Sequence, residues 1–165
     1  MRTIVIGFAI TVLSTAAVAQ PSPSDQSVKT YSSSSDVAAL QAKAKSDRKG
    51  NAPIVVERIL QLAPYNANLE YRAAVGPASI HEKEAEFFYV IDGSATMVTG
   101  GKLMNESRTN AENLTGSGIE GGTPRNVAKG DFIVVPENTP HWFSSINGSI
   151  TLMSLHAPRG TGGTH

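Results

Sequence analysis

Three side chains in this sequence have the types and the order of metal ligands: His81, Glu86 and His141. Two imidazoles and one carboxylate can hold a divalent metal ion and leave coordination positions open for water or a substrate. Each of the three lies on or beside a stretch with the residue pattern of a β-strand that ends at a glycine or proline turn. The sequence therefore predicts one divalent metal ion, Fe, Mn, Ni or Zn, held inside a small β-domain.

The alternation of side chains along a strand allows these ligands to share one interior. Residues two positions apart point to the same face, so the residues at even spacing from each ligand are expected to face the metal as well. A small barrel built in this way encloses a ligand pocket with a partly apolar wall. The predicted lining residues lie at even spacing from a ligand or on the last strand: Ser79, Phe88, Phe143, Ser145 and His156.

The elements that position these residues are predicted to be short strands. From Pro53 onward, apolar and β-branched runs alternate with turn residues. The dipeptides Asp92-Gly93 and Asn147-Gly148 favour tight hairpin turns. Many short strands with regular turns and little helix are typical of an all-β sandwich or barrel. The expected strands cover residues 54–62, 69–75, 79–81, 86–91, 95–98, 132–135, 142–146 and 150–156.

The first 19 residues have the layout of a secretory signal peptide. A positive charge at Arg2 precedes an apolar run over residues 3–13, and the small residues Ala17-Val18-Ala19 form a cleavage site. The apolar run is short for a membrane-spanning helix, so we expect cleavage rather than an uncleaved anchor. The predicted location is the periplasm or the cell exterior, without membrane association once residues 1–19 are removed.

The remaining chain divides into a leader, a barrel and a tail. Residues 20–52 are expected to form a flexible leader with a short helix over 37–49, for which Asp36 is the predicted N-cap. Residues 53–158 are expected to form the barrel, and residues 159–165 a flexible tail.

The stretch 102–124 interrupts the regular spacing of the strands. It is polar and contains four glycines, which predicts a long loop. Such a loop is either a lid at the mouth of the pocket or a mobile connection without a role of its own.

The composition excludes several classes of function. The 14 basic and 14 acidic residues balance, so the chain lacks the positive charge that binding to nucleic acid requires. The chain has no cysteine, which excludes a disulfide framework, a thiol nucleophile and a thiolate metal site. It also lacks the Gly-x-Ser-x-Gly elbow of serine hydrolases.

The two ligand-bearing segments resemble the two motifs of the cupin superfamily. The first motif, His-x-His, three or four residues, Glu, six residues and Gly, aligns with Ser79, His81, Glu86 and Gly93. The second motif, Gly, five residues, Pro-x-Gly, two residues, His, three residues and Asn, aligns with Gly130, Pro136, Asn138, His141 and Ser145. The resemblance covers roughly residues 54–156.

The chain departs from the family pattern at three positions. Ser79 stands in place of the first histidine, Asn138 in place of the second motif's glycine, and Ser145 in place of its asparagine. Asparagine tolerates the left-handed backbone conformation that glycine adopts. The resemblance implies a small antiparallel β-barrel of the double-stranded β-helix or jelly-roll type, in which three of the four family ligands remain.

Two functions fit this reading, and a third needs no metal. The first is a periplasmic mononuclear metalloenzyme that acts on a small organic substrate by dioxygenase, isomerase or lyase chemistry. The alternative is a non-catalytic module that binds a small ligand, and the third is a structural cupin without metal. Tyr71 and Arg72 alternate on a predicted strand, and an inward Arg72 could pair with a substrate carboxylate, although a solvent-facing Arg72 is the expected case. No catalytic residue is identified, and the resemblance alone suggests a homodimer.

Overall fold

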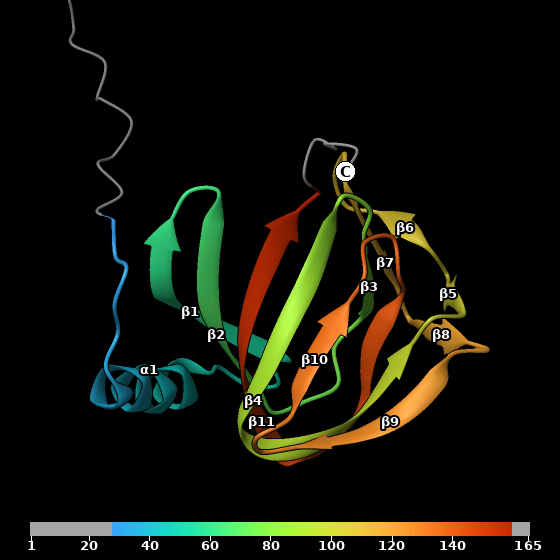
Figure 1. Cartoon of the computed structure of the whole chain (residues 1–165). Coiled ribbons are helices and arrows are strands. Elements are labelled where there is room, and N and C mark those ends of the chain that lie inside the picture. Colours follow the sequence, from blue (N-terminus) through green and yellow to red (C-terminus); the bar gives the residue numbers. More distant parts are fainter. Residues whose placement is uncertain (1–27, 160–165) are drawn as a thin grey trace, which may run out of the picture.

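The computed structural model describes residues 28–159, which form antiparallel strands and one helix (Figure 1). The all-β, jelly-roll prediction is confirmed. The predicted signal peptide, residues 1–19, lies outside the described residues, as does most of the predicted tail.

The helix α1 spans Ser34–Asp47 and precedes all the strands. The strands, in chain order, are β1 Ile54–Leu62, β2 Tyr65–Arg72, β3 Ala78–His81, β4 Glu84–Thr99, β5 Lys102–Met104, β6 Ser107–Arg108, β7 Asn113–Gly116, β8 Gly118–Glu120, β9 Thr123–Ala128, β10 Phe132–Val135 and β11 His141–Pro158.

The long strands β4 and β11 form the centre of the sheet. They pair antiparallel from end to end, and the pairing continues as β1-β2-β11-β3-β7-β6, with β9 and β10 on the other side of β4. Strands β5 and β8 form a separate two-stranded sheet. Because this pairing leaves edge strands, the sheet does not close on itself, so the predicted β-barrel of the jelly-roll type is not a closed one. The architecture is an open jelly roll.

Both predicted hairpin turns are wrong. Strand β4 continues through Gly93, and β11 continues through Gly148. Both glycines have positive φ, 80° and 75°, and a side chain at Gly93 would clash with the backbone of Ser149. The two paired strands therefore bend together at these residues instead of reversing, since Ile146 still pairs with Ala95 beyond the bend. Figure 1 shows the bend at the lower end of β4 and β11.

Two apolar clusters stabilise the fold. One fills the interior of the jelly roll and consists of Phe88, Val90, Ala95, Met97, Val127, Val135, Phe143, Ile150 and Leu152. The other lies between α1 and the outer face of β1 and β2 and consists of Ala44, Ile59, Ala67, Leu69 and Tyr71. Alternation along β2 sends the residues at 67, 69 and 71 to the helix, so Glu70 and Arg72 face the interior.

The helix begins earlier than predicted. Its N-cap is Ser33, whose hydroxyl accepts a hydrogen bond from the Asp36 N–H, while the Asp36 carboxylate accepts one from the Ser33 N–H. Asp36 is thus the third residue of a capping box and not the cap itself. Ala44 is fully buried against the sheet, and Gln41 donates a hydrogen bond to Thr151. Within residues 28–159, no helix is long and apolar enough to cross a membrane.

The stretch 102–124 is largely a set of short strands and not a loop. Strand β7 pairs with β3 along its whole length, and His81 is the register partner of Asn113. The prediction of a long loop is wrong, because the stretch pairs with the sheet; the lid stays a prediction. The pairing also brings side chains of β7 next to a predicted metal ligand.

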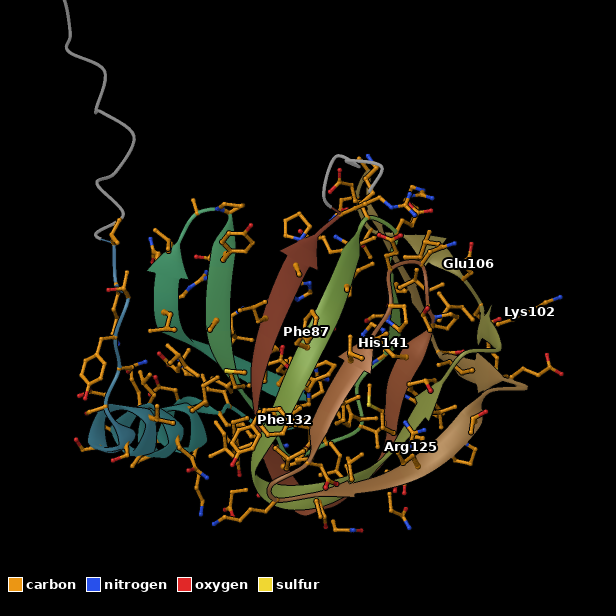
Figure 2. All side chains as sticks on the ribbon, in the orientation of Figure 1. Phe87, Lys102, Glu106, Arg125, Phe132 and His141 are labelled. Atoms are coloured by element: carbon orange, nitrogen blue, oxygen red, sulfur yellow. The ribbon has the colours of Figure 1, made fainter. Side chains whose placement is uncertain are left out.

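The outer face of β4 and β10 carries exposed apolar side chains. Phe132 is 80% exposed, and Phe87 and Val134 are also exposed. The three lie with Met153 and Leu155 around one surface groove. Figure 2 shows Phe87 and Phe132 on neighbouring strands, on the opposite face of the sheet from the interior.

Candidate metal centre

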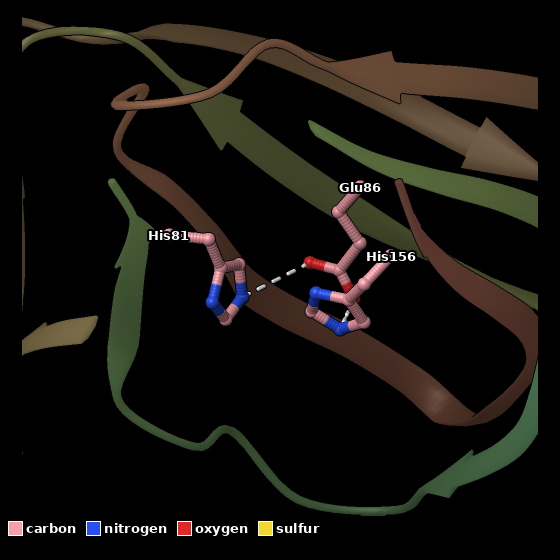
Figure 3. A group of neighbouring side chains, drawn as sticks. All are labelled: His81, Glu86 and His156. Atoms are coloured by element: carbon pink, nitrogen blue, oxygen red, sulfur yellow. Dashed lines mark ion pairs between the residues drawn. The ribbon is translucent and has the colours of Figure 1, made fainter. Parts of the chain in front are cut away.

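The site is built around one carboxylate, that of Glu86 on β4. Its side chain faces the interior, and the residue is 3% exposed. Three imidazoles direct Nε2 at its two oxygens: His81 at 3.4 Å and His141 at 3.1 Å from Oε2, and His156 at 3.3 Å from Oε1. Figure 3 shows His81 and His156 approaching the carboxylate from different directions.

Strand pairing explains why residues so far apart in sequence meet here. His141 is the first residue of β11 and the register partner of Ser79, which places it beside β3 and His81. His156 lies near the other end of β11 and is the register partner of Glu86. Because β4 and β11 bend together, both ends of β11 reach the same carboxylate.

An oxygen atom also faces the second nitrogen of each ring. His81 Nδ1 lies 2.6 Å from Asn113 Oδ1, and His141 Nδ1 lies 3.2 Å from the Thr139 carbonyl oxygen. His156 Nδ1 lies 3.2 Å from Glu84 Oε2, although the angle does not make a hydrogen bond. Each Nε2 hydrogen faces the Glu86 carboxylate, and a metal ion at this point would take the place of that hydrogen while the oxygen at Nδ1 keeps the ring in place.

The charges of the cluster are mutually stabilised. Burial by itself would raise the pKa of the Glu86 carboxyl, but hydrogen bonds from His141, His156 and His81 lower that pKa far below its usual range. Burial opposes protonation of His81, yet its contacts with Glu86 and Asn113 raise its pKa overall. The hydrogen bond to Glu86 raises the pKa of His156 against the effect of burial. A carboxylate that stays ionised among imidazoles is a suitable anionic ligand for a cation.

The donor atoms are close enough to bind one ion. One nitrogen or oxygen from each of His81, Glu86 and His156 lies within 4.8 Å of the others. The His141 ring adjoins this group, with its centroid 5.3 Å from that of His81 and its Nε2 on the same carboxylate. Imidazole and carboxylate donors in this number fit a divalent first-row transition metal.

The structure brings together the three predicted ligands. Of the predicted lining residues, some lie next to the site and one does not. Phe88 and Phe143 are buried next to the site, with the Phe88 ring 6.3 Å from His141 and 5.6 Å from Phe143. Ser145 is exposed, because a register shift after Phe143 interrupts the alternation, so its prediction as a lining residue is wrong. His156, predicted only to line the pocket, belongs with His81 and Glu86 to the group of side chains that could hold a metal ion, whereas His141 lies beside this group.

Two neighbours of the site were missing from the sequence prediction. Asn113 lies in the stretch predicted as a loop, and Glu84 stands in a charged run, residues 82–84, directly after His81. The identity of Asn138 was easier to explain: its φ is 54°, and its N–H donates a hydrogen bond of 2.7 Å to the His81 carbonyl oxygen. The left-handed turn therefore fixes the strand end that carries a ligand.

An arginine faces the interior near the site, against the expected solvent-facing orientation. Arg72 donates from Nε and Nη2 to a single oxygen of Glu70, at 3.0 and 2.8 Å, and its guanidinium lies 4.9 Å from the centre of the Phe143 ring. Glu70 also accepts a hydrogen bond of 2.8 Å from Ser154. The side chain of Arg72 is 19% exposed, so the pair is partly accessible from solvent.

Comparison with protein families gives a match over most of the chain. The sequence model of a family described as Cupin matches residues 52–157. A comparison with curated protein sequences found no match.

Comparison with solved structures identifies the same kind of fold. The iron(II) form of HppE aligns with a TM-score of 0.50 and 17% identity over 67% of this chain and 54% of HppE, so the present chain spans about half of that protein. KdgF from Halomonas aligns with a TM-score of 0.48 and 18% identity, over 68% and 87% of the two chains. A double-stranded β-helix protein from Klebsiella pneumoniae gives 0.48 and 15%, over 70% and 85%.

Proposed function

The chain belongs to the cupin family, and on that premise we propose that it is a mononuclear metalloenzyme acting on a small organic molecule. The observation that carries the proposal is the convergence of three Nε2 atoms on the buried Glu86 carboxylate. The residues proposed to hold the ion are His81, Glu86 and His141, and His156 lies beside them. A bound divalent ion would act as a Lewis acid on a carbonyl or hydroxyl group of the substrate.

The protein's own side chains would position that substrate. Phe88 and Phe143 form an apolar wall beside the ligands and keep water away from this side of the site. Arg72 stacks over Phe143 and uses only Nε and Nη2 to bind Glu70. Its Nη1 is therefore suited to a substrate carboxylate, which makes small organic acids the first class to test.

The use of Arg72 can be tested without knowing the reaction. Small mono- and dicarboxylates are added to the metal-loaded protein, and the melting temperature is compared between wild type and Arg72→Gln. We expect some of these acids to raise the melting temperature of the wild type, with the shift reduced or lost in the variant, while the metal content stays equal. Equal shifts in both proteins would remove Arg72 from the proposal.

The metal centre is tested by elemental analysis of protein purified without a histidine tag. We expect about one equivalent of metal per chain, lost in His141→Ala and kept in His165→Ala, which removes the one histidine that lies outside the described residues. Protein that is metal-free and gains no thermal stability from Mn, Fe, Ni or Zn would contradict the proposal.

A non-catalytic cupin that binds a small ligand is the second candidate. Ser79 in place of the family's first histidine favours it, because the change alters the ligand set on which the family's chemistry depends. The binding module is expected with or without metal, so turnover separates the two candidates: the enzyme consumes a small organic acid that it binds, whereas the binding module releases it unchanged.

Location and assembly belong to the same proposal. The signal-peptide pattern of residues 1–19 supports the periplasm or the cell exterior, which cell fractionation of the full-length protein can test. The homodimer expected from the family resemblance would most plainly use β10, an edge strand with exposed Phe132. Sedimentation of wild type and Phe132→Ser would show a dimer that weakens in the variant, or a monomer in both.

A further inference from the structure

We infer that His156, from β11, takes the place of the metal ligand that Ser79 no longer supplies from β3. The inference rests on the proposed metal centre and adds to it a change in the ligand set. The family pattern draws three histidines and one glutamate from its two motifs, whereas His156 lies beyond both motifs. The proposed site would thus keep the number and type of donors with one donor relocated to another strand.

The first step is the position of Ser79. It lies two residues before His81 on β3 and is the register partner of His141. A histidine at this position would therefore stand among the ligands, beside both of these imidazoles. A serine hydroxyl is short and a weak donor to divalent metals, so the replacement leaves the site one strong ligand short.

The second step is the position of His156. It is directly opposite Glu86 in the pairing of β4 and β11, and its Nε2 lies 3.3 Å from Oε1. The other two imidazoles lie on Oε2 of the same carboxylate. The His156 and His81 rings are 4.6 Å apart in an edge-to-face arrangement, which leaves both Nε2 atoms near the carboxylate.

The third step is the support behind His156. Its Nδ1 is buried without a hydrogen bond, and Glu84 Oε2 lies 3.2 Å away. A small rotation of either side chain would complete a carboxylate–histidine pair of the kind that orients metal ligands. A histidine that served only to neutralise Glu86 would not need a second carboxylate at its other nitrogen.

The test is a ligand exchange between the two strands. Four proteins are compared with wild type: His156→Ala, His156→Gln, Ser79→His and the double variant Ser79→His with His156→Ala. Zn²⁺ and Mn²⁺ affinities are measured by competition with a chelator, and the visible spectrum of the Co²⁺ form reports the coordination. His165→Ala is the matched control for the loss of a histidine.

We expect both His156 variants to bind Zn²⁺ at least about 100-fold more weakly and to change the Co²⁺ spectrum, since each loses a direct ligand. The double variant is expected to recover to within about tenfold of wild type, because the family histidine returns on β3. Circular dichroism of the metal-free proteins identifies a variant that does not fold, and His156→Gln covers the case in which the alanine variant fails.

The outcomes separate this inference from the proposal on which it rests. A wild-type protein that binds no metal would contradict the metal centre as a whole. A wild type that binds metal while both His156 variants bind it equally well would overturn the role of His156 alone. Weakened binding that Ser79→His does not restore in the double variant would overturn the exchange between strands.

Discussion

Strands β3 and β11 lie side by side at the Glu86 carboxylate but contribute to it unequally. Strand β3 has four residues and supplies His81 near its end, whereas β11 has 18 residues and supplies both His141 and His156. The difference lies in the bend of β11, which brings both ends of one strand to the same point. On the proposed ligand exchange, a long bent strand would replace a ligand lost from a short neighbour without any change of fold.

The largest loss of metal affinity is expected at Glu86, whose carboxylate the histidines of both β3 and β11 contact. Glu86→Gln removes the negative charge that all three imidazoles face, at a residue that is 3% exposed. We expect metal binding to fall below detection by isothermal calorimetry, because a neutral amide replaces the anionic ligand. Retention of wild-type affinity would show that Glu86 is not the common centre of the two strands.

The bend shared by β4 and β11 is expected to depend on the close packing at Gly93. Gly93→Ala places a side chain against the backbone of Ser149 at a φ of 80°, while Gly148→Ala has a φ of 75° and open space. We expect urea unfolding to show a loss of about 3 kcal/mol for Gly93→Ala and about 1 kcal/mol for Gly148→Ala. Equal losses would mean that the close packing at Gly93 does not hold the bend.

The side chains next to the Nδ1 atoms of His81 and His156 are expected to have smaller effects on metal affinity. Asn113 Oδ1 lies 2.6 Å from Nδ1 of the proposed β3 ligand His81, whereas Glu84 approaches the proposed β11 ligand His156 without a hydrogen bond. Asn113→Ala should weaken metal binding by about 10- to 100-fold, and Glu84→Ala by less than about tenfold. Competition with a chelator measures the metal affinity of both variants. A larger loss in Glu84→Ala than in Asn113→Ala would mean that the better-oriented histidine lies on β11.

The sequence predicted the residues that meet at Glu86 better than their surroundings. His81, Glu86 and His141 lie together, as their places in two local motifs predicted, and their role as metal ligands stays a prediction. Ser145 was misplaced because a register shift in β11 reverses the face that alternation assigns. Asn113 was missed because the pairing of β7 with β3 joins distant segments and leaves no local pattern.

The β-class of the fold could be predicted from the sequence, but the course of its longest strands could not. The short apolar runs predict an all-β sandwich or barrel, and the resemblance to cupins implies the jelly roll, but Gly93 and Gly148 lie inside strands and not in the predicted hairpin turns. The glycine of each dipeptide does adopt a positive φ, whereas Asp92 and Asn147 do not, so neither dipeptide forms the turn in which both residues have positive φ. Whether such a residue reverses a strand or bends it depends on whether the partner strand continues alongside, which no local sequence shows.

The most direct measurement is the anomalous diffraction of crystals soaked separately in Mn²⁺ and Zn²⁺. The proposed account predicts one strong peak inside the jelly roll, bonded to Glu86 and to Nε2 of His81, His141 and His156, with the zinc at about 2.0–2.2 Å from each ligand atom. A peak bonded to the first three residues with His156 turned away would restrict the ligands to the family motifs. A crystal with no peak at Glu86 would contradict the metal centre itself.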